Sequence, residues 1–171
     1  PFARIKLKDM IKYIFEKGNN IKMKNVTQIM KKWKDEYKLE NIENISMLRG
    51  ISDYEKFVLN DRQYLSLKKG CPIHVRAAAI YNYILNQNKE FKKKYNFIHT
   101  GDKVRYYYVK NSVEEKNIFA FIPGDYPIEF APDIDYDTMF AKVMIDPINR
   151  FLKVIGNFTI PKNLIYSRKL W

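Results

Sequence analysis

The chain of 171 residues is poor in cysteine and histidine, the residues that form disulfides and bind zinc. It has one cysteine, Cys71, and two histidines, His74 and His99. A single cysteine excludes an intramolecular disulfide, and these three residues do not have the spacing of a zinc site. No apolar run is long enough to cross a membrane. The sequence therefore excludes disulfide scaffolds, zinc fingers and membrane-spanning proteins as classes, and Cys71 is interpreted as a small buried residue.

Catalytic patterns are also missing. There is no glycine-rich phosphate loop, no Ser/His/Asp set and no Cys/His pair. The densest acidic cluster is Asp133, Asp135 and Asp137, and it is interpreted as the start of a helix, where carboxylates are favoured by the dipole. The sequence therefore predicts a binding module without a catalytic centre of its own.

Positive charge is abundant. The chain has 31 Lys and Arg against 19 Asp and Glu, a net charge of +12 and a pI of about 9.6. Such an excess indicates a polyanionic partner. It is equally explained by AT-rich codons, because Asn, Ile, Tyr and Phe are abundant too. Arg4, Lys8 and Lys12 share one helical face, which is either solvated surface or a row that follows a nucleic-acid backbone.

Apolar periodicity predicts four long helices. The first carries a stripe from Leu7 to Phe15 and ends at Gly18. The second spans residues 21–39, and the third spans 71–88 with its apolar face on Ile73, Ala77, Ile80, Tyr81, Ile84 and Leu85. The fourth begins with Asp135 as N-cap and ends at Gly156, with a kink or break at Pro147. In the first two helices the residues expected inside are Leu7, Met10, Ile11, Ile14, Phe15, Val26, Ile29, Met30, Trp33 and Tyr37.

Strand signals are fewer. Val104–Val109 and Ile118–Ile122 predict an antiparallel pair, and Ile45–Leu48 is a short extended segment. Residues 49–70 form a long irregular stretch. The predicted fold class is α+β, mainly helical, with a small antiparallel strand element. We expect one domain, in which the stripes of Leu7–Phe15, Ile80–Leu85 and Met139–Ile155 meet in one core.

Basic residues recur where the chain turns. Arg49 precedes Gly50, which permits a tight turn and the close approach of another backbone. Lys69-Gly70-Cys71-Pro72 leads into the third helix, and Pro72 suits a first helical turn. Lys69, His74 and Arg76 crowd that helix N-terminus. Cations there are favourable if a phosphate backbone passes by; the alternative is a solvated basic helix start.

Four spaced segments resemble the C-terminal thumb region of T4-like bacteriophage family B DNA polymerases. They are Arg49–Phe57, Lys69–Tyr83, Thr100–Val104 and Asp135–Phe140, and the resemblance runs from about Ala3 to Gly156. Leu48 and Ala77 stand where many relatives have proline and glycine. Residues 1–156 would then be the thumb, which grips duplex primer-template through sugar–phosphate contacts that carry no sequence information.

The resemblance implies the site and its partners. The implied DNA-binding residues are Arg49, Gly50, Ser52, Lys56, Lys69, His74, Arg76, Lys103 and Arg105. The catalytic carboxylates and their Mg²⁺ would belong to a palm domain absent from this chain, so the chain needs no cofactor and is inactive alone. Its partners would be duplex DNA and the palm, fingers and exonuclease, in the cytoplasm of a bacterial host. A free-standing, non-specific nucleic-acid-binding protein of similar fold is the alternative.

Residues 157–171 form a tail that matches the family poorly. Because the chain starts at Pro1, we expect it to be a piece of a longer protein. Polymerases of this family usually end in an acidic and aromatic peptide that docks on a sliding clamp. Leu170-Trp171 is either the first half of such a peptide or a pair that packs on the domain. We expect Ile160–Trp171 to be poorly packed and to bind a clamp weakly or not at all.

Overall fold

The first two helices form where the apolar stripes predict them. α1 spans Phe2–Lys17 and ends at Gly18, whose φ of 48° suits glycine. A 3₁₀ turn, Gly18–Asn20, leads to α2, Met23–Leu39, and a short helix α3, Ile42–Ile45, follows. The computed structural model describes residues 1–110, 116–156 and 158–164, and its fold class is α+β, mainly helical, as predicted.

The predicted fourth helix is continuous but changes its winding before Pro147. α7 spans Tyr136–Phe140, a π-helical turn covers Ala141–Ile145, and α8 runs Asp146–Gly156. The amide of Asp146 donates to the carbonyl of Ala141, five residues back. Pro147 has no N–H to donate to the carbonyl four residues earlier. The wider turn therefore absorbs the defect, and the helix is neither sharply broken nor regular.

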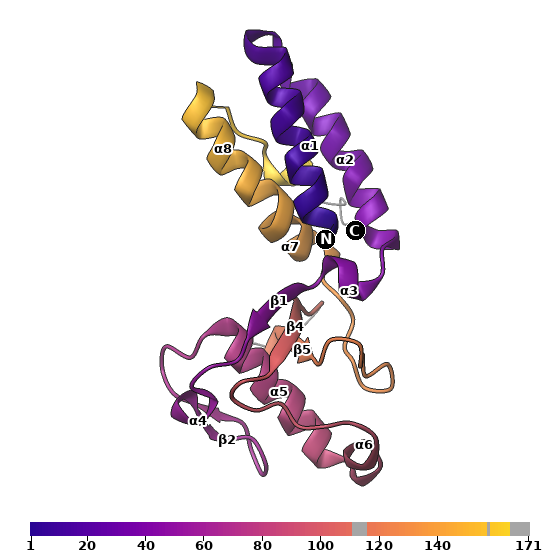
Figure 1. Cartoon of the computed structure of the whole chain (residues 1–171), viewed down its shortest axis with the longest axis vertical. Coiled ribbons are helices and arrows are strands. Elements are labelled where there is room, and N and C mark those ends of the chain that lie inside the picture. Colours follow the sequence, from indigo (N-terminus) through magenta and orange to yellow (C-terminus); the bar gives the residue numbers. More distant parts are fainter. Residues whose placement is uncertain (111–115, 157, 165–171) are drawn as a thin grey trace. The chain divides into compact units, whose positions relative to one another are not determined.

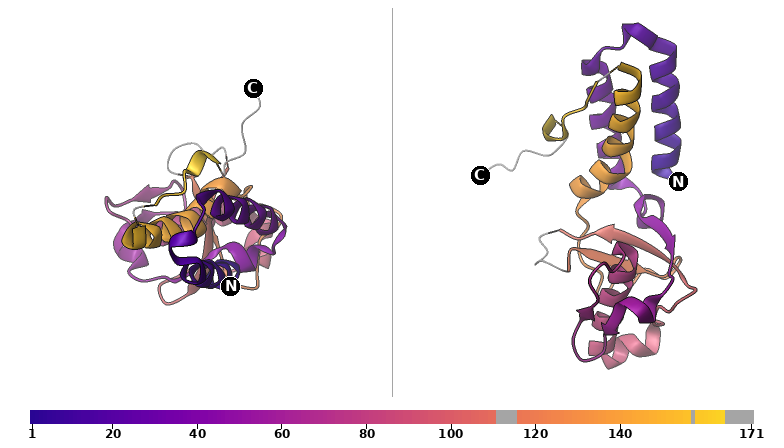
Figure 2. Two further views of the ribbon diagram at one scale, coloured as in Figure 1. Left: turned by 90° about the horizontal axis from the view of Figure 1, so that it is seen from above. Right: turned by 90° about the vertical axis from the view of Figure 1, so that its left-hand side faces the viewer.

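These helices build a helical unit, formed by Pro1–Ile45 together with the described part of Tyr136–Trp171. α1, α2 and α8 lie side by side in it (Figures 1 and 2). Its core contains Met10, Ile14, Val26, Met30, Tyr37, Met139, Phe140, Met144, Ile145, Ile148 and Leu152.

Part of the predicted apolar face of α1 and α2 lies outside this core. Phe15 is 69% exposed and Ile11 36% exposed, so the prediction that both point inward is wrong. Trp33 is half-buried beneath the Lys6 ammonium, which lies 5.3 Å from its ring centroid. Three helices leave a narrow interface, and a stripe of five residues is wider than that interface can cover.

One buried charge in the helical unit is missing from the sequence interpretation. Lys34 on α2 is 3% exposed and forms an ion pair with Asp137 on α7. The neighbouring Tyr37 packs edge-on against Phe2, Tyr136 and Phe140, and its hydroxyl donates to the Ile45 carbonyl over 3.1 Å. Burial raises the pKa of Tyr37, so the phenol stays protonated and remains a donor. The polar contacts therefore fix α2 against α3 and α7.

The other part of the chain, Ser46–Asp135, is a second compact unit built on a sheet. The sheet order is β1-β4-β5, with β1 Met47–Gly50, β4 Lys103–Tyr108 and β5 Ile118–Phe121. Both pairings are antiparallel, with Arg49 opposite Val104 and Tyr107 opposite Phe119. The predicted β4–β5 pair is therefore confirmed. The extended segment expected at Ile45–Leu48 lies two residues further on, and pairs as a third strand.

Short elements occupy the stretch predicted to be irregular. α4 spans Tyr54–Phe57, and β2, Val58–Asn60, pairs with β3, Ser66–Leu67. The third long helix is α5, Ile73–Gln87, and the charged run after it is a separate helix, α6, Lys89–Lys94, capped by the Asn88 side chain. α5 packs against β5 and β4. Its buried face is broader than predicted, because Val75, Ala78, Ala79 and Asn82 are buried too.

The division into two units corrects one expectation. The stripes of α1 and α8 lie in the helical unit, whereas Ile80–Leu85 lies in the sheet unit. The prediction that the three stripes meet in one core is therefore wrong. No proline-rich or glycine-rich linker marks the two crossings of the chain, at residues 45–46 and 135–136. Composition therefore gives no signal for this division.

The segment after α8 is partly described. The backbone of Ile160 is gripped at both ends by the Asn149 side chain, which accepts from its N–H over 2.7 Å and donates to its carbonyl over 3.0 Å. Ile160 is fully buried, so the expectation of poor packing is wrong at this residue. A 3₁₀ turn follows at Lys162–Leu164. The predictions for Leu170 and Trp171 lie outside the described residues.

Candidate nucleic-acid interface

Arg49 and Gly50 lie on β1, one of the two edge strands of the three-stranded sheet. Leu48, Arg49 and Gly50 are all exposed. Gly50 pairs with Lys103 and does not have a positive φ, and the space beside its Cα is open. The tight turn that a glycine would permit here is therefore not formed. Its open face is nevertheless where another backbone could approach closely.

His74 and Arg49 come together beside Tyr106. Arg49 and Tyr106 share one face of the sheet, because paired residues and alternate residues along a strand point the same way. The His74 ring centroid lies 6.4 Å from that of Tyr106. Burial, followed by the Arg49 charge, lowers the pKa of His74. At neutral pH the imidazole is therefore uncharged, and His74 offers hydrogen bonds at this helix start instead of the cation that the sequence suggests.

The segment that carries Ser52 and Lys56 is anchored to the segment before β4. The amide of Ile51 donates to the Asp102 carbonyl over 2.8 Å, and the amide of Tyr54 donates to the Thr100 hydroxyl over 3.0 Å. Ser52 and Lys56 are exposed, and the Lys56 ammonium lies 5.3 Å from the Phe57 ring centroid. Two segments that are about fifty residues apart in sequence thus form one rigid edge.

A hydrogen bond reinforces that edge. The Thr100 hydroxyl donates to the Glu55 carboxylate over 2.7 Å, and this bond lowers the pKa of Glu55. Asp53 occupies the left-handed region at φ 53°, just before α4. Non-glycine residues adopt this conformation at a cost, and aspartate tolerates it better than most. The turn is therefore held in one conformation by its partners.

Lys69 and Arg76 differ in how accessible they are. Lys69 is exposed in the turn before α5, next to Gly70 at φ 82°. Arg76 is half-buried, and its Nη2 donates to the Asn117 side chain over 3.0 Å. Its Nε is buried and has no hydrogen-bond partner among the described residues. Lys69 can reach a ligand freely, whereas Arg76 also joins α5 to the residue before β5.

Lys103 and Arg105 lie on β4 beside Arg49 and Gly50. They point to the opposite face from Tyr106, because side chains alternate along a strand. Lys103 is exposed, and Arg105 donates through Nη1 to the Ser46 carbonyl over 3.2 Å. Pairing of β1 with β4 places these two residues on the strand next to that of Arg49, with their side chains on the opposite face of the sheet.

A buried polar network supports this surface, and the sequence interpretation does not include it. Asn82 on α5 donates to the Ile98 carbonyl and to the Tyr54 hydroxyl, both over 2.8 Å, and accepts from the Ile98 amide. The Tyr54 hydroxyl donates to Asp61 over 2.6 Å. The available signal was Asn82 itself, a polar residue on the apolar face of a predicted helix.

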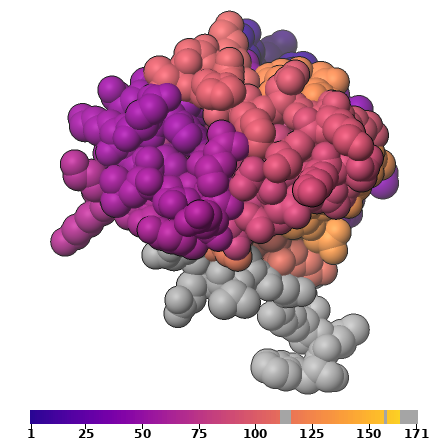
Figure 3. All heavy atoms as spheres, turned by 90° about the horizontal axis from the view of Figure 1, so that it is seen from below, coloured from indigo at the N-terminus to yellow at the C-terminus, as the bar shows by residue number. Residues whose placement is uncertain are grey.

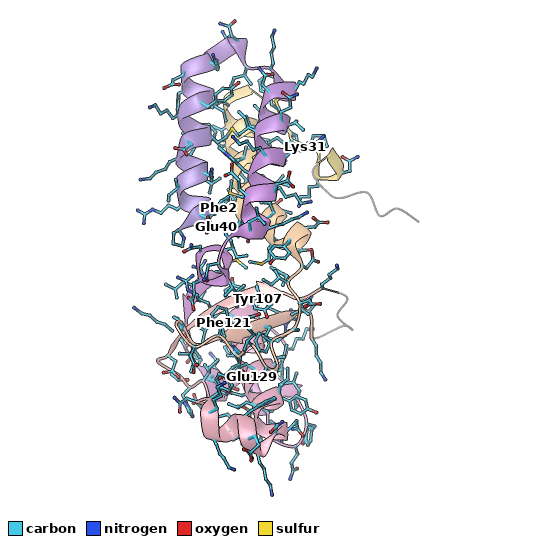
Figure 4. The ribbon with its side chains drawn as sticks, turned by 90° about the vertical axis from the view of Figure 1, so that its right-hand side faces the viewer. Phe2, Lys31, Glu40, Tyr107, Phe121 and Glu129 are labelled. Atoms are coloured by element: carbon cyan, nitrogen blue, oxygen red, sulfur yellow. The ribbon has the colours of Figure 1, made fainter. Side chains whose placement is uncertain are left out.

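A second polar network fixes the segment around Glu129, between β5 and α7. Figure 4 labels Glu129, near α6, and the sheet residues Tyr107 and Phe121. Both Lys94 and Tyr95 donate to the Glu129 carboxylate, and these bonds lower the pKa of Glu129 to about 2. The ring of Phe130 stacks on Phe91, with centroids 4.9 Å apart. The aromatic residues here hold the scaffold together.

The helical unit has a basic groove of its own, which was not singled out from the sequence. It has a volume of about 580 Å³ and lies between α8 and the segment around Thr159. Its single carboxylate, Asp146, pairs with Lys162 over 2.7 Å. The cations that line it are Lys142, Arg150, Lys153 and Lys162. Most of the excess of basic residues in the chain also lies in the helical unit.

Comparison with known proteins gives no assignment. Neither a protein-family model nor a curated protein sequence matches this chain. Within the described residues, no helix is long and apolar enough to cross a membrane. The same part of the chain holds no group of three or more His, Cys, Asp or Glu side chains arranged to bind a metal ion.

Proposed function

We propose that this chain is the duplex-gripping thumb of a bacteriophage family B DNA polymerase, acting in the cytoplasm of a bacterial host. The resemblance of its four segments supports this function. Three of them, Arg49–Phe57, Lys69–Tyr83 and Thr100–Val104, also meet in the sheet unit around β1 and β4. The observation that carries the proposal is that one segment with exposed Arg49 is joined to both of the others. It pairs with the strand that begins at Lys103, and the Phe57 carbonyl accepts from the amide of Lys68, next to exposed Lys69, over 2.8 Å.

The mechanism follows from the chemistry of that edge. Arginine and lysine donate to phosphate oxygens, and open backbone at Gly50 lets the sugar–phosphate chain come close. Such contacts fix the position of a duplex without reading its bases. The basic groove of the helical unit adds positive charge that attracts the same polyanion. Nucleotidyl transfer itself would be performed by a palm domain with its Mg²⁺.

Duplex binding by the whole chain tests the proposal. We expect weak binding without sequence preference, measured by fluorescence anisotropy on two unrelated duplexes. If about five phosphates are neutralised, log K falls with log[salt] at a slope of about −4 to −5. Arg49→Gln should weaken binding equally on both duplexes and reduce the slope by about 1.

Controls separate a contact from general electrostatics. Lys93→Gln removes an exposed cation that is already paired with Glu90, and should leave binding nearly unchanged. Arg76→Gln should reduce stability as well as binding, because Arg76 also bonds Asn117. Binding that is independent of salt, or strongly selective for one duplex, would contradict the proposal. So would nucleotide incorporation by this chain alone with Mg²⁺, which should not occur.

A further inference from the structure

One pocket of the sheet unit lies along the segment that precedes β4 and reaches Lys103, the first residue of that strand. Its volume is about 770 Å³, within the range of small-molecule sites. Its walls come from the end of α6, from the segment between α6 and β4, and from the turn after β5. The lining residues are Lys92, Tyr95, Asn96, Phe97, His99, Asp102, Lys103, Ile122 and Pro123.

Phe97 provides an aromatic platform in this pocket. The Arg62 guanidinium lies 3.8 Å from the centroid of its ring and covers one face. The backbone of Arg62 is fixed because Asn86 and Gln87 both donate to its carbonyl, over 2.9 and 3.0 Å, and its Nε lies 3.4 Å from the Asp61 carboxylate. Figure 3 shows the face of this unit where the segment around residue 60 lies beside the segment around residue 95. Phe97 is half-buried and lines the pocket, whereas Arg62 does not.

The charge around this platform is positive. Lys92 and Lys103 are exposed, and within the part of the chain that the structure describes no carboxylate lies within ion-pair distance of Lys103. The single lining carboxylate, Asp102, accepts from the His99 amide over 2.8 Å, so the lining carries two lysine charges against one carboxylate charge. The pocket therefore combines a supported aromatic face, an apolar wall at Ile122, and two cations.

We propose that this pocket binds one nucleoside phosphate unit, with the base against Phe97 and the phosphate between Lys103 and Lys92. Base stacking on aromatic side chains is tolerant of sequence, and lysines track the phosphates. Asn96 is exposed in the pocket and presents an amide that can pair with a base edge. A duplex keeps its bases stacked inside, so the pocket goes beyond the proposed duplex grip. The bound nucleotide is either free in solution or an unpaired nucleotide of a DNA strand.

Removal of the aromatic face is the direct test. Binding of a thymidine oligonucleotide is compared with binding of an abasic oligonucleotide of the same length. Phe97→Ala should weaken binding of the thymidine strand by about 5- to 150-fold and leave the abasic strand unchanged. Phe97→Leu keeps apolar volume but has no ring, and covers the case in which Phe97→Ala does not fold. Tyr64→Leu, an exposed ring outside the pocket, is the matched control and should have no effect.

The phosphate part is tested with Lys103→Gln, which should weaken both strands alike, whereas Lys93→Gln should weaken neither. Free thymidine monophosphate distinguishes the two sources. Phe97-dependent binding of the free nucleotide assigns the pocket to nucleotides in solution; dependence seen only with the strand assigns it to unpaired DNA. Either result supports the proposal. An affinity for the thymidine strand that is unchanged in both Phe97 variants overturns it, and so does wild-type binding in which the thymidine and abasic strands are equally strong.

The result of the Phe97 test does not depend on the result of the duplex-binding experiment. Phe97→Leu should leave blunt-duplex binding unchanged, because Phe97 is not among the proposed duplex contacts; Lys103 is the residue that the two proposals share. If the wild-type chain fails to bind duplex yet binds the thymidine strand through Phe97, the proposed thumb function fails and the pocket assignment stands. The reverse result refutes the pocket alone.

Discussion

At the scale of single residues, buried polar side chains fix the position of the segment that carries the exposed cations Arg49 and Lys56. Asn82 makes three hydrogen bonds inside the sheet unit, two to the backbone of Ile98 and one to Tyr54. Tyr54 begins α4, which follows directly after Ser52 and Asp53. The position of the Arg49–Lys56 edge therefore depends on an amide that touches no ligand.

Replacing Asn82 should be costly. In Asn82→Ala the N–H and carbonyl of Ile98 lose their partner while they stay buried, and an unsatisfied buried group costs about 1–3 kcal/mol. We expect the free energy of unfolding in urea to fall by that amount. Asn86→Ala, which removes an exposed bond to the Arg62 carbonyl, should change it by less than about 0.5 kcal/mol. Equal losses of unfolding free energy for the two variants would show that the buried network stabilises the fold no more than an exposed hydrogen bond does.

His74 gives a prediction in pH. Its folded-state pKa is lowered by burial and then by Arg49. The unfolded chain therefore binds more protons near the ordinary histidine pKa, and stability falls as pH drops below that value. NMR titration of the His74 ring should show a higher pKa in Arg49→Gln. It should not return fully to the ordinary value, because burial remains.

A control for this titration is Arg62→Gln, which removes a cation elsewhere in the sheet unit and should leave the His74 pKa unchanged. An unchanged pKa in Arg49→Gln would mean that the two side chains do not interact in solution.

At the scale of elements, the sequence predicts what has local causes. α1, α2, α5 and the helix around Pro147 follow from apolar periodicity, and Gly18 ends α1 as expected. The β4–β5 pair follows from a run of tyrosines and aliphatic residues. β1 could not be assigned in register, because its partner lies more than fifty residues away and four residues give no clear alternation.

Substitution of two glycines by alanine should have different effects on the free energy of unfolding. Gly70 has φ 82°, where a side chain is strained, so Gly70→Ala should cost about 1 kcal/mol. Gly50 lies in β1 without positive φ and with open space beside it, so Gly50→Ala should leave the free energy of unfolding unchanged or slightly raised. Urea titration of both variants measures this. A large loss at Gly50 would indicate that the strand differs from the structure.

The candidate site, like strand β1, depends on contacts between residues that are distant in sequence. Exposed basic residues can be chosen from sequence, but their roles depend on distant neighbours. Arg76 is half-buried and bonds Asn117, and burial and Arg49 lower the pKa of His74. The Phe97 platform depends on Arg62, which lies thirty-five positions earlier. None of these pairings has a local signature, so the sequence could rank the candidates only by charge.

At the scale of the whole molecule, the chain folds into two units that differ in charge and in continuity. The proposed duplex contacts all lie in the sheet unit, whereas most of the positive excess lies in the helical unit. Residues 46–135 alone should therefore bind duplex with a shallower salt slope than the whole chain. They should also unfold cooperatively, because their core is their own. An equal slope for the piece and the whole chain would exclude the helical unit from binding.

The helical unit is interrupted in sequence, since its core needs Met10 and Met30 from one end and Leu152 and Ile160 from the other. This has a consequence for synthesis on the ribosome, where the chain emerges from its N-terminus at about 5–20 residues per second. α1 and α2 emerge first, yet they must wait about 100 residues, or roughly 5–20 seconds, for α8. The nested sheet unit is complete before then. Within these 171 residues, the helices that are made first are thus the last to complete their core, and their apolar stripes are open to chaperones in the meantime.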